Sequence, residues 1–236
     1  MIIPFYKYQG TGNDFVIING IENQIIELDT TQIQHICSRK FGVGSDGLII
    51  IKKSNKNHFK MDFYNPDGSQ SFCGNGARCA VHFAYASNVL TENPCVFDAI
   101  DGEHKAFICK DEVKIEMSSI GKIEDVDASE YSSLIGNAHF LNTGSPHFAS
   151  YVESTDEMDS IIDIGRQIRF SKRFKKDGVN VNLIYQRELN SIEMRTYERG
   201  VEDETLSCGT GATACALIHA SQDNFEGNLI DVKTKG

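Results

Sequence analysis

Two cysteines stand directly before short glycine turns, in Cys73-Gly-Asn-Gly and Cys208-Gly-Thr-Gly. Each turn precedes an alanine-rich stretch with apolar residues at helical spacing, so we expect a helix to begin at each cysteine. The first turn of a helix carries unpaired backbone N–H groups and a partial positive charge, which favour a thiolate and lower the pKa of a cysteine. Each of these thiols could therefore act as an acid or a base.

The glycines of the two turns have a second use. Because they lack Cβ atoms, the N–H groups around them can approach an anion such as a carboxylate closely. Two such turns facing one small ligand would suit inversion of a carbon next to a carboxylate. One group removes a proton from one face, and the other returns a proton to the opposite face. Donors aimed at the carboxylate would stabilise the carbanion without a cofactor.

The other five cysteines have a simpler, structural interpretation. They are Cys37, Cys79, Cys95, Cys109 and Cys215. A free cysteine is usually a small buried apolar residue, and we expect this of all five. Because no C-x₂₋₄-C pair is present, we expect no zinc site. A disulfide between Cys73 and Cys208 is sterically conceivable if the two halves face each other, but a reducing compartment disfavours it.

Four pairs of segments recur in the same order in both halves of the chain, and their members lie 132 to 136 residues apart. The pairs are GTGNDF (10–15) with NTGSPHF (142–148), GVGSDGLII (42–50) with GVNVNLI (178–184), MDFYN (61–65) with MRTYE (194–198), and CGNGARCA (73–80) with CGTGATACA (208–216). Four matches in register indicate a duplication. We predict two domains of like topology, 1–118 and 119–236, with the boundary near SSIGKIEDVDASE (118–130).

Each half shows the same coarse order of elements: strand, helix, glycine-rich turn, strand, strand, Cys-Gly turn, helix and further strands. DFVIING and GLIIIKK are β-branched runs bounded by turn residues, which favours strands, and DTTQIQHICSRKF has a helix-start residue and helical spacing. The pattern predicts an α/β or α+β class. The stretch 42–47 matches G-x-G-x-x-G but lies between a helix and a strand, the reverse of the order in a dinucleotide-binding fold.

Composition excludes several classes of protein. The 236 residues are 40% hydrophobic and 24% charged, as in ordinary globular domains, and no apolar run approaches the length of a membrane span. A net charge of −10 argues against nucleic-acid binding, and we expect the one basic cluster, RFSKRFKKDG (169–178), to be a solvated helix end or loop. The first residues do not show a secretory pattern and the seven cysteines are odd in number, so we expect reduced thiols in a cytoplasm.

Six motifs together resemble those of the diaminopimelate epimerase family. They are GTGNDF, GVGSDGL, FYNPDGSQSFCGNGARC, NTGSPH, GVNVNL and ERGVEDETLSCGTGATAC, spread over residues 10–215. The resemblance implies two pseudo-symmetric duplicated domains, each a curved, mostly antiparallel sheet wrapped around a central helix. It also implies cofactor-independent epimerisation of LL- to meso-diaminopimelate by a thiol and a thiolate, in lysine and peptidoglycan biosynthesis. A homodimer, no metal and no pyridoxal phosphate complete the expectation.

The same resemblance assigns roles to individual residues. Cys73 and Cys208 would be the acid–base pair, with His147 and Glu198 as the other catalytic residues. Substrate would be bound by Asn13, Asn65, Gly74, Asn75, Asn180, Glu198, Arg199, Gly209 and Thr210. The residues after each cysteine would close around the α-carboxylate and amine, and Glu198 with Arg199 would fix the distal amino acid group or polarise the site. Without the family, His147 after a proline would be predicted in a surface loop.

The chain departs from some family members at three places. Gly47 stands where some carry a glutamine that contacts substrate, Ser145 stands where the common motif has asparagine, and the sequence stops at DVKTKG, before the family's last strands. Two other functions stay open. One is a racemase of proline or hydroxyproline type, with a similar fold and thiol pair. The other is a catalytically silent domain pair that binds an amino-acid-like anion.

Overall fold

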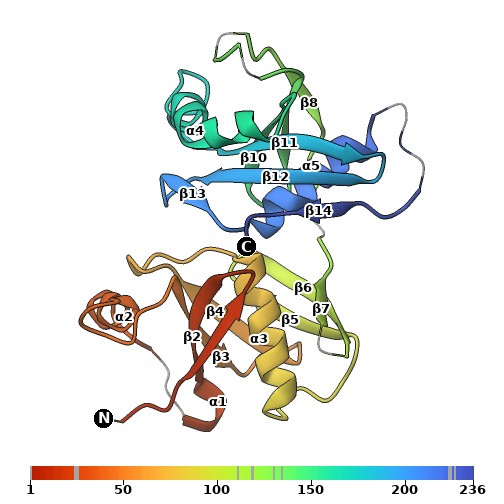
Figure 1. The fold of residues 1–236 in the computed structure, drawn as a ribbon. Helices are drawn as coiled ribbons and strands as arrows, with labels where there is room; N and C mark the ends of the chain where they lie inside the picture. Colours follow the sequence, from red (N-terminus) through yellow and green to blue (C-terminus); the bar gives the residue numbers. More distant parts are fainter. Residues whose placement is uncertain are drawn as a thin grey trace. The chain divides into compact units, whose positions relative to one another are not determined.

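A computed structural model describes residues 2–23, 27–110, 112–117, 120–129, 131–133, 135–222, 225 and 227–236. The chain divides into two compact units, Met1–Ser118 and Ser119–Gly236. Figure 1 shows that each unit has its own curled sheet and its own helices. Within the described residues, no helix has both the length and the apolar character that crossing a membrane requires.

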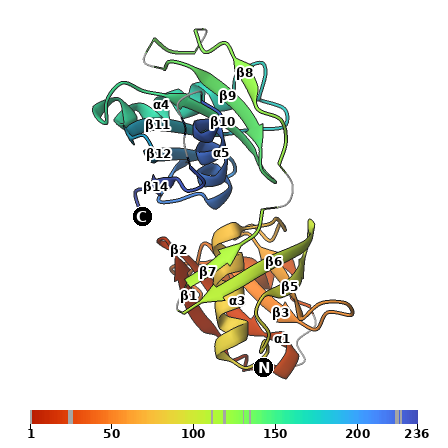
Figure 2. The same cartoon turned by 90° about the vertical axis from the view of Figure 1, so that its right-hand side faces the viewer.

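The sheet of the first unit follows the order β1-β2-β3-β4-β5-β6-β7. Its strands are β1 (Tyr6–Gly10), β2 (Asn13–Asn19), β3 (Gly47–Lys52), β4 (Phe59–Tyr64), β5 (Cys95–Ala99), β6 (Gly102–Cys109) and β7 (Glu112–Ile115). The pairs β2–β3 and β4–β5 are parallel and the other neighbours are antiparallel. Helix α3 (Gly74–Ala86) contacts both edge strands, β1 and β7, so the sheet curls around it (Figure 2).

Strands β2 and β3 are buried on both faces. Ile49 and Ile51 of β3 pack in the core with α3, whereas Leu48 and Ile50 pack in a smaller core beneath α2 (Thr30–Cys37). A strand covered on both sides needs an unbroken apolar run, which is what its sequence provides. The predictions of strands at DFVIING and GLIIIKK are confirmed. The predicted helix that follows a helix-start residue is α2, which Asp29 caps; a short helix, α1 (Gly20–Asn23), precedes it.

The second unit repeats this plan. Its sheet follows the order β13-β12-β11-β10-β9-β8, and β14 pairs with β12. The strands are β8 (Glu124–Val126), β9 (Ala138–Asn142), β10 (Pro146–Tyr151), β11 (Asn180–Glu188), β12 (Ser191–Glu198), β13 (Asp203–Thr205) and β14 (Asp231–Lys233). Helix α5 (Gly209–Ala220) contacts strands β9 to β12. Helix α4 (Ile161–Arg169), entered through a 3₁₀ turn at Asp156–Ser160, also contacts β11 and β12 but packs in a separate core.

The two units match in the order and the direction of their strands. In the first, an antiparallel partner, the parallel pair β2–β3 and then β4 precede α3; in the second, β9, the parallel pair β10–β11 and then β12 precede α5. The predicted α+β class, with a curved and mostly antiparallel sheet in each half, is confirmed. Within the described residues, β14 is the strand that follows α5.

The five cysteines outside the Cys-Gly turns were all predicted to be buried, and one of these predictions is wrong. Four of them are buried as expected, namely Cys37, Cys79, Cys95 and Cys215. Cys109 is exposed, so its predicted burial is wrong. It ends strand β6, where side chains alternate between the two faces, and Ile108 takes the inward position. The basic stretch 169–178 follows the end of α4 as a solvated loop, as predicted, anchored by the buried Phe174.

Candidate active site

Cys73 and Cys208 occupy the same position in their units. Cys73 is the N-cap of α3, with φ −126° and ψ 111°, and Cys208 is the N-cap of α5, with φ −126° and ψ 112°. The predicted helix starts are therefore confirmed. Both sulfurs sit where the first N–H groups of a helix are unpaired, the place where a thiolate or another anion is favoured.

The glycine turn of the first unit leaves room directly after Cys73. A Cβ added at Gly74 would meet no atom within 4 Å, so packing does not explain why this residue is small. Asn75 is buried, and its side-chain oxygen accepts a hydrogen bond from Arg78. Gly209 and Thr210 hold the same two positions after Cys208. The N–H groups of both turns are therefore placed to donate to a small anion.

The Cys73 thiol lies between a donor and an acceptor. The N–H of Gly76 donates to Sγ at 3.4 Å, and Sγ lies 3.8 Å from Oδ1 of Asn13. The Asn13 amide is oriented from behind, because its Nδ2 donates to Asp46 Oδ2 at 3.1 Å. Asp46 is in turn ion-paired with Arg39 at 2.5 Å. A partly exposed network of charges thus turns the oxygen of Asn13 toward the thiol.

Beneath the start of α3 the sheet is apolar. A Cβ on Gly76 would lie 3.3 Å from Cδ1 of Ile49. On the strands to either side of β3, the rings of Phe15 (β2) and Phe63 (β4) meet edge to face with centroids 6.0 Å apart. We call Phe15, Ile49 and Phe63 the apolar floor. Every one of them is at most 5% exposed.

The Cys208 thiol has polar neighbours. Its Sγ lies 3.4 Å from Oγ1 of Thr210, and the same hydroxyl lies 2.9 Å from Nε2 of His147. The Thr210 carbonyl accepts a hydrogen bond of 2.9 Å from the hydroxyl of Thr143, which ties the turn to the loop before β10. A hydrogen-bonded path therefore runs from Cys208 into the sheet.

His147 is fully buried on β10, so the alternative prediction of a surface loop is wrong. Its Nδ1 lies 3.2 Å from Nδ2 of Asn182, and Oδ1 of Asn182 lies 2.9 Å from the Thr196 hydroxyl. Burial, with a smaller contribution from the positive charge of Arg199, lowers the pKa of His147 to about 3. The ring is therefore neutral near pH 7. We call His147, Asn182 and Thr196 the polar floor.

The other predicted residues of the second unit surround the end of β10. Asn180 donates from Nδ2 to the Ser145 hydroxyl at 2.8 Å, and its Oδ1 accepts from the backbone N–H of Arg199 at 2.9 Å. Glu198 is the last residue of β12 and precedes Arg199. Asn180, Ser145, Glu198 and Arg199 are thus gathered at one end of strands β10 to β12.

In the first unit, Asn65 and Gly47 have structural roles: Asn65 bonds to the backbone of a turn, and Gly47 packs against an aromatic ring. The Asn65 amide donates to the Ser69 carbonyl at 3.2 Å, which closes the turn leading from β4 toward Cys73. A Cβ on Gly47 would come within 2.4 Å of the Phe63 ring. A glutamine at position 47 would therefore require Phe63 to move, and the apolar floor explains why glycine stands there.

Two residues near the site, Asn182 and Thr196, were not predicted from the sequence. The GVNVNL motif places two asparagines two residues apart, and residues at that spacing share one face of a strand. That alternation could have indicated Asn182 as a neighbour of the site. Nothing in MRTYE marks Thr196, because its contact with Asn182 depends on the register between β11 and β12.

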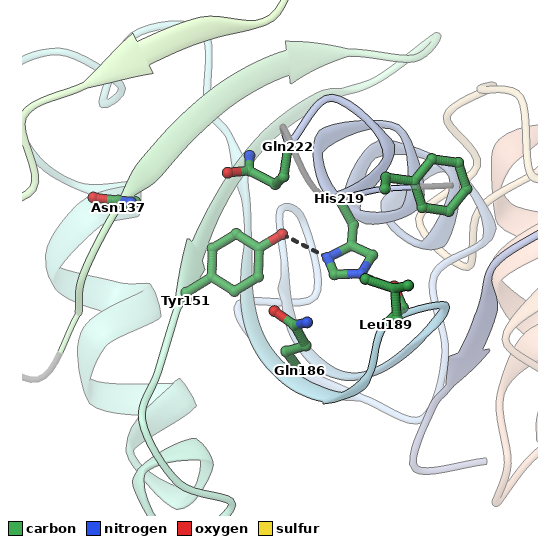
Figure 3. A pocket seen from close by; sticks show the side chains of 7 residues that line it. Asn137, Tyr151, Gln186, Leu189, His219 and Gln222 are labelled. Atoms are coloured by element: carbon green, nitrogen blue, oxygen red, sulfur yellow. Dashed lines mark hydrogen bonds between the residues drawn. The ribbon is translucent and has the colours of Figure 1, made fainter. Parts of the chain in front are cut away.

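A separate cavity of about 230 Å³ in the second unit contains none of the predicted residues. It is lined by Asn137, Tyr151, Gln186, Leu189, His219, Gln222 and Phe225 (Figure 3). Both ring nitrogens of His219 are used, since Nδ1 lies 3.0 Å from the Tyr151 hydroxyl and Nε2 lies 2.9 Å from the Leu189 carbonyl. Burial raises the pKa of Tyr151. The histidine there is held by structural hydrogen bonds.

Comparison with known proteins identifies the family of the chain. The family model described as diaminopimelate epimerase matches residues 5–124 and 139–236. The chain belongs to the diaminopimelate epimerase family, a family of isomerases. The diaminopimelate epimerase of Flavobacterium psychrophilum is 41% identical over 236 residues, which cover 99% of this chain and 88% of that protein. The diaminopimelate epimerase of Aquifex aeolicus is 41% identical over 249 residues, covering 99% and 87% of the two chains.

More distant solved structures share the fold of the diaminopimelate epimerase family. A PhzF-family phenazine biosynthesis protein of Bacillus anthracis has a TM-score of 0.69 at 13% identity, and the match covers 96% of this chain and 82% of that one. A hydroxyproline epimerase of Agrobacterium vitis with bound trans-4-hydroxy-L-proline has a TM-score of 0.61 at 13% identity, covering 92% and 76%. Identity this low shows the fold alone, so the architecture does not separate the epimerase from the racemase alternative.

Proposed function

We propose that this chain epimerises LL-diaminopimelate to meso-diaminopimelate without a cofactor. The observation that carries the proposal is the pair of cysteines with the same N-cap conformation, one at the start of α3 and one at the start of α5. Family membership supplies the substrate, because the relatives at 41% identity bear that name. The two units are, in this proposal, the halves 1–118 and 119–236 of a duplicated epimerase.

In the proposed mechanism one cysteine acts as a thiolate and the other as a thiol. The thiolate removes the α-proton from one face, and the thiol delivers its proton to the opposite face of the resulting carbanion. The N–H groups of Gly74, Asn75, Gly209 and Thr210 would hold the α-carboxylate, where negative charge accumulates. The open space beside Gly74 supports this role, because it leaves an anion room to approach the backbone.

The remaining site residues bind and orient substrate in this proposal. Asn13 and Asn65 would act from the first unit, and Asn180, Glu198 and Arg199 from the second. The bonds that join Asn180 to Ser145 and to the Arg199 backbone support the second group, because they hold these residues in one cluster. Glu198 would also serve catalysis by polarising the site.

We further propose that the protein works as a cytoplasmic homodimer in lysine and peptidoglycan biosynthesis. All seven cysteines lie among the described residues and none of them forms a disulfide, which fits a reducing compartment. The net charge of −10 fits a small-molecule enzyme with no nucleic-acid partner. Size measurement in solution with light scattering tests the dimer, and a monomeric mass would contradict it.

Parallel assays with different substrates test the proposed function. The reduced protein is given LL-diaminopimelate, L-proline and trans-4-hydroxy-L-proline in separate reactions, and the isomers are separated by chiral chromatography. We expect meso-diaminopimelate to form and both prolines to remain unchanged. Turnover of a proline alone would overturn the substrate assignment. Tight binding of diaminopimelate without exchange of its α-proton would favour the silent binding protein, and the absorbance band of a bound aldehyde would reveal pyridoxal phosphate.

A further inference from the structure

The orientation of the Asn182 amide is determined by a backbone group. Its Nδ2 lies 3.0 Å from the carbonyl oxygen of Phe148, which can only accept a hydrogen bond. The NH₂ end of the amide must therefore face this carbonyl, and its second hydrogen points to Nδ1 of His147, 3.2 Å away. The Thr196 hydroxyl, 2.9 Å from Oδ1, donates to the other end of the amide.

This orientation fixes the tautomer of His147. Because Nδ1 accepts a hydrogen bond from Asn182, it carries no proton, and the proton of the neutral ring is on Nε2. The Nε2–H then donates to Oγ1 of Thr210 at 2.9 Å. Because the Thr210 oxygen accepts this hydrogen bond from His147, its own hydroxyl proton can point at Sγ of Cys208, 3.4 Å away.

We propose that Asn182 and Thr196 are positioning residues, which fix His147 as its Nε2–H tautomer and so aim the Thr210 hydroxyl proton at Cys208. The assignment rests on the proposed function in one respect only, the acid–base role of Cys208. A hydrogen bond donated to sulfur favours the thiolate over the thiol. The positive charge of Arg199 also disfavours protonation of His147.

The first unit has apolar side chains at the equivalent place beneath its thiol. The side chains of the apolar floor carry no hydrogen-bonding group, and Oδ1 of Asn13, an acceptor, lies 3.8 Å from Sγ of Cys73. The hydroxyl donor beside Cys208 favours a thiolate at that residue. The polar floor thus distinguishes two thiols that occupy equivalent N-cap positions.

Nitrogen-15 NMR of the histidine rings in the intact protein tests the tautomer. The His147 signals are assigned by their loss in His147→Gln. We expect a protonated Nε2 and an unprotonated Nδ1 in the unmodified protein. In Asn182→Asp, which has the same shape, a carboxylate oxygen faces Nδ1, and we expect the proton to move to Nδ1. A protonated Nδ1 in the unmodified protein, or an unchanged ring in a folded Asn182→Asp, would overturn the proposal.

A second pair of variants keeps the proposal testable if Asn182→Asp does not fold. Thr196→Val removes the hydroxyl with little change of shape, whereas Thr196→Ser retains it. Alkylation of Cys208 by iodoacetamide is followed by mass spectrometry in a Cys73→Ala background, across a range of pH. We expect Thr196→Val to slow alkylation near neutral pH roughly five-fold, the effect of one hydrogen bond, and Thr196→Ser to restore the rate. Equal rates in the two variants would contradict the proposed chain.

Ser150→Ala is the matched control. Ser150 is also fully buried on β10, but its hydroxyl bonds only to the carbonyls of Gly136 and Asn137. We expect it to reduce stability without changing the His147 tautomer or the alkylation of Cys208. If it slows alkylation as Thr196→Val does, the effect is one of general loosening and the proposal fails. No readout here uses diaminopimelate, so the result stands apart from whether the protein epimerises that substrate.

Discussion

The starts of α3 and α5 have the same backbone but different surroundings. Their N-cap cysteines differ by one degree in ψ, and each helix follows an equivalent set of strands. Beneath α3 lies the apolar floor, and beneath α5 lies the polar floor. The strand register shows that these are equivalent places, because Phe15 faces Gly47 across β2–β3 as His147 faces Asn180 across β10–β11.

The contrast between the two floors shows how a duplicated scaffold can become asymmetric. The backbone has kept the two helix starts, while the residues one layer deeper have diverged. Over an apolar layer, the helix N-terminus favours the thiolate form of its cysteine. A buried chain of hydrogen bonds supplies the thiol with a directed donor in addition. Acid–base inversion needs two groups in opposite protonation states, and diverged floors under equivalent thiols are one way to provide them.

Removing either thiol should reduce activity more than any other change. Cys73→Ala and Cys208→Ala should each lower kcat for epimerisation by about 10²–10⁴-fold or more, because one face loses its proton-transfer group. Cys79→Ala is the control, since this buried thiol lies in the core of the first unit and burial raises its pKa to about 11. Epimerisation at the full rate in either N-cap variant, measured by chiral chromatography, would rule out equivalent roles for the two helix starts.

A smaller effect separates the two floors directly. A Cβ on Gly211 would come within 2.8 Å of Asn182 Oδ1 and 3.2 Å of His147 Cε1, whereas a Cβ on Gly76 would lie 3.3 Å from the flexible end of Ile49. We expect Gly211→Ala to lower the free energy of unfolding by about 1–3 kcal/mol and Gly76→Ala by less. Urea titration compares the two variants. Equal losses of unfolding free energy in the two variants would mean that the polar floor and the apolar floor accommodate an added methyl group equally well.

The pH dependence of stability offers a third comparison. The folded pKa of His147, about 3, lies below the roughly 6.5 of an unfolded histidine. Between these values the unfolded chain binds a proton here and the folded chain does not, so stability falls as the pH falls. From pH 6.5 to 5 the loss should be about 2 kcal/mol in the unmodified protein and absent in His147→Gln. Urea titrations that shift in parallel for both proteins would contradict the neutral buried ring.

The smallest effect is expected in the charged network of the first unit. Asp46 orients the Asn13 amide, but the side chains of Asp46 and Arg39 are 37% and 59% exposed. Exposed ion pairs contribute little and are screened by salt. Asp46→Asn should therefore raise KM less than about five-fold, more at low salt than at high salt, with kcat nearly unchanged. A large loss of kcat in steady-state assays would place Asp46 in the chemistry instead.

Local sequence predicted the frame of the site but not its inner layer. The helix starts at Cys73 and Cys208 followed from glycine turns before alanine-rich stretches, and the strands around residues 13–19 and 47–52 from β-branched runs. The polar floor depends on three strands lying side by side in a fixed register, so Asn182 meets residues 35 positions before it and 14 after it. Such contacts are set by tertiary packing. The exposure of Cys109 likewise depended on which face of β6 met the core.

Isotope incorporation during the first turnovers tests most directly whether two thiols act on opposite faces of one carbon. LL-Diaminopimelate is mixed with reduced protein in D₂O, and both isomers are isolated early and analysed by mass spectrometry. Because each thiol exchanges its proton with solvent, we predict one deuterium at the inverted α-carbon of the meso product and none in the remaining LL substrate. Early meso product that retains the substrate's own α-proton would show that a single group serves both faces, and would contradict the account.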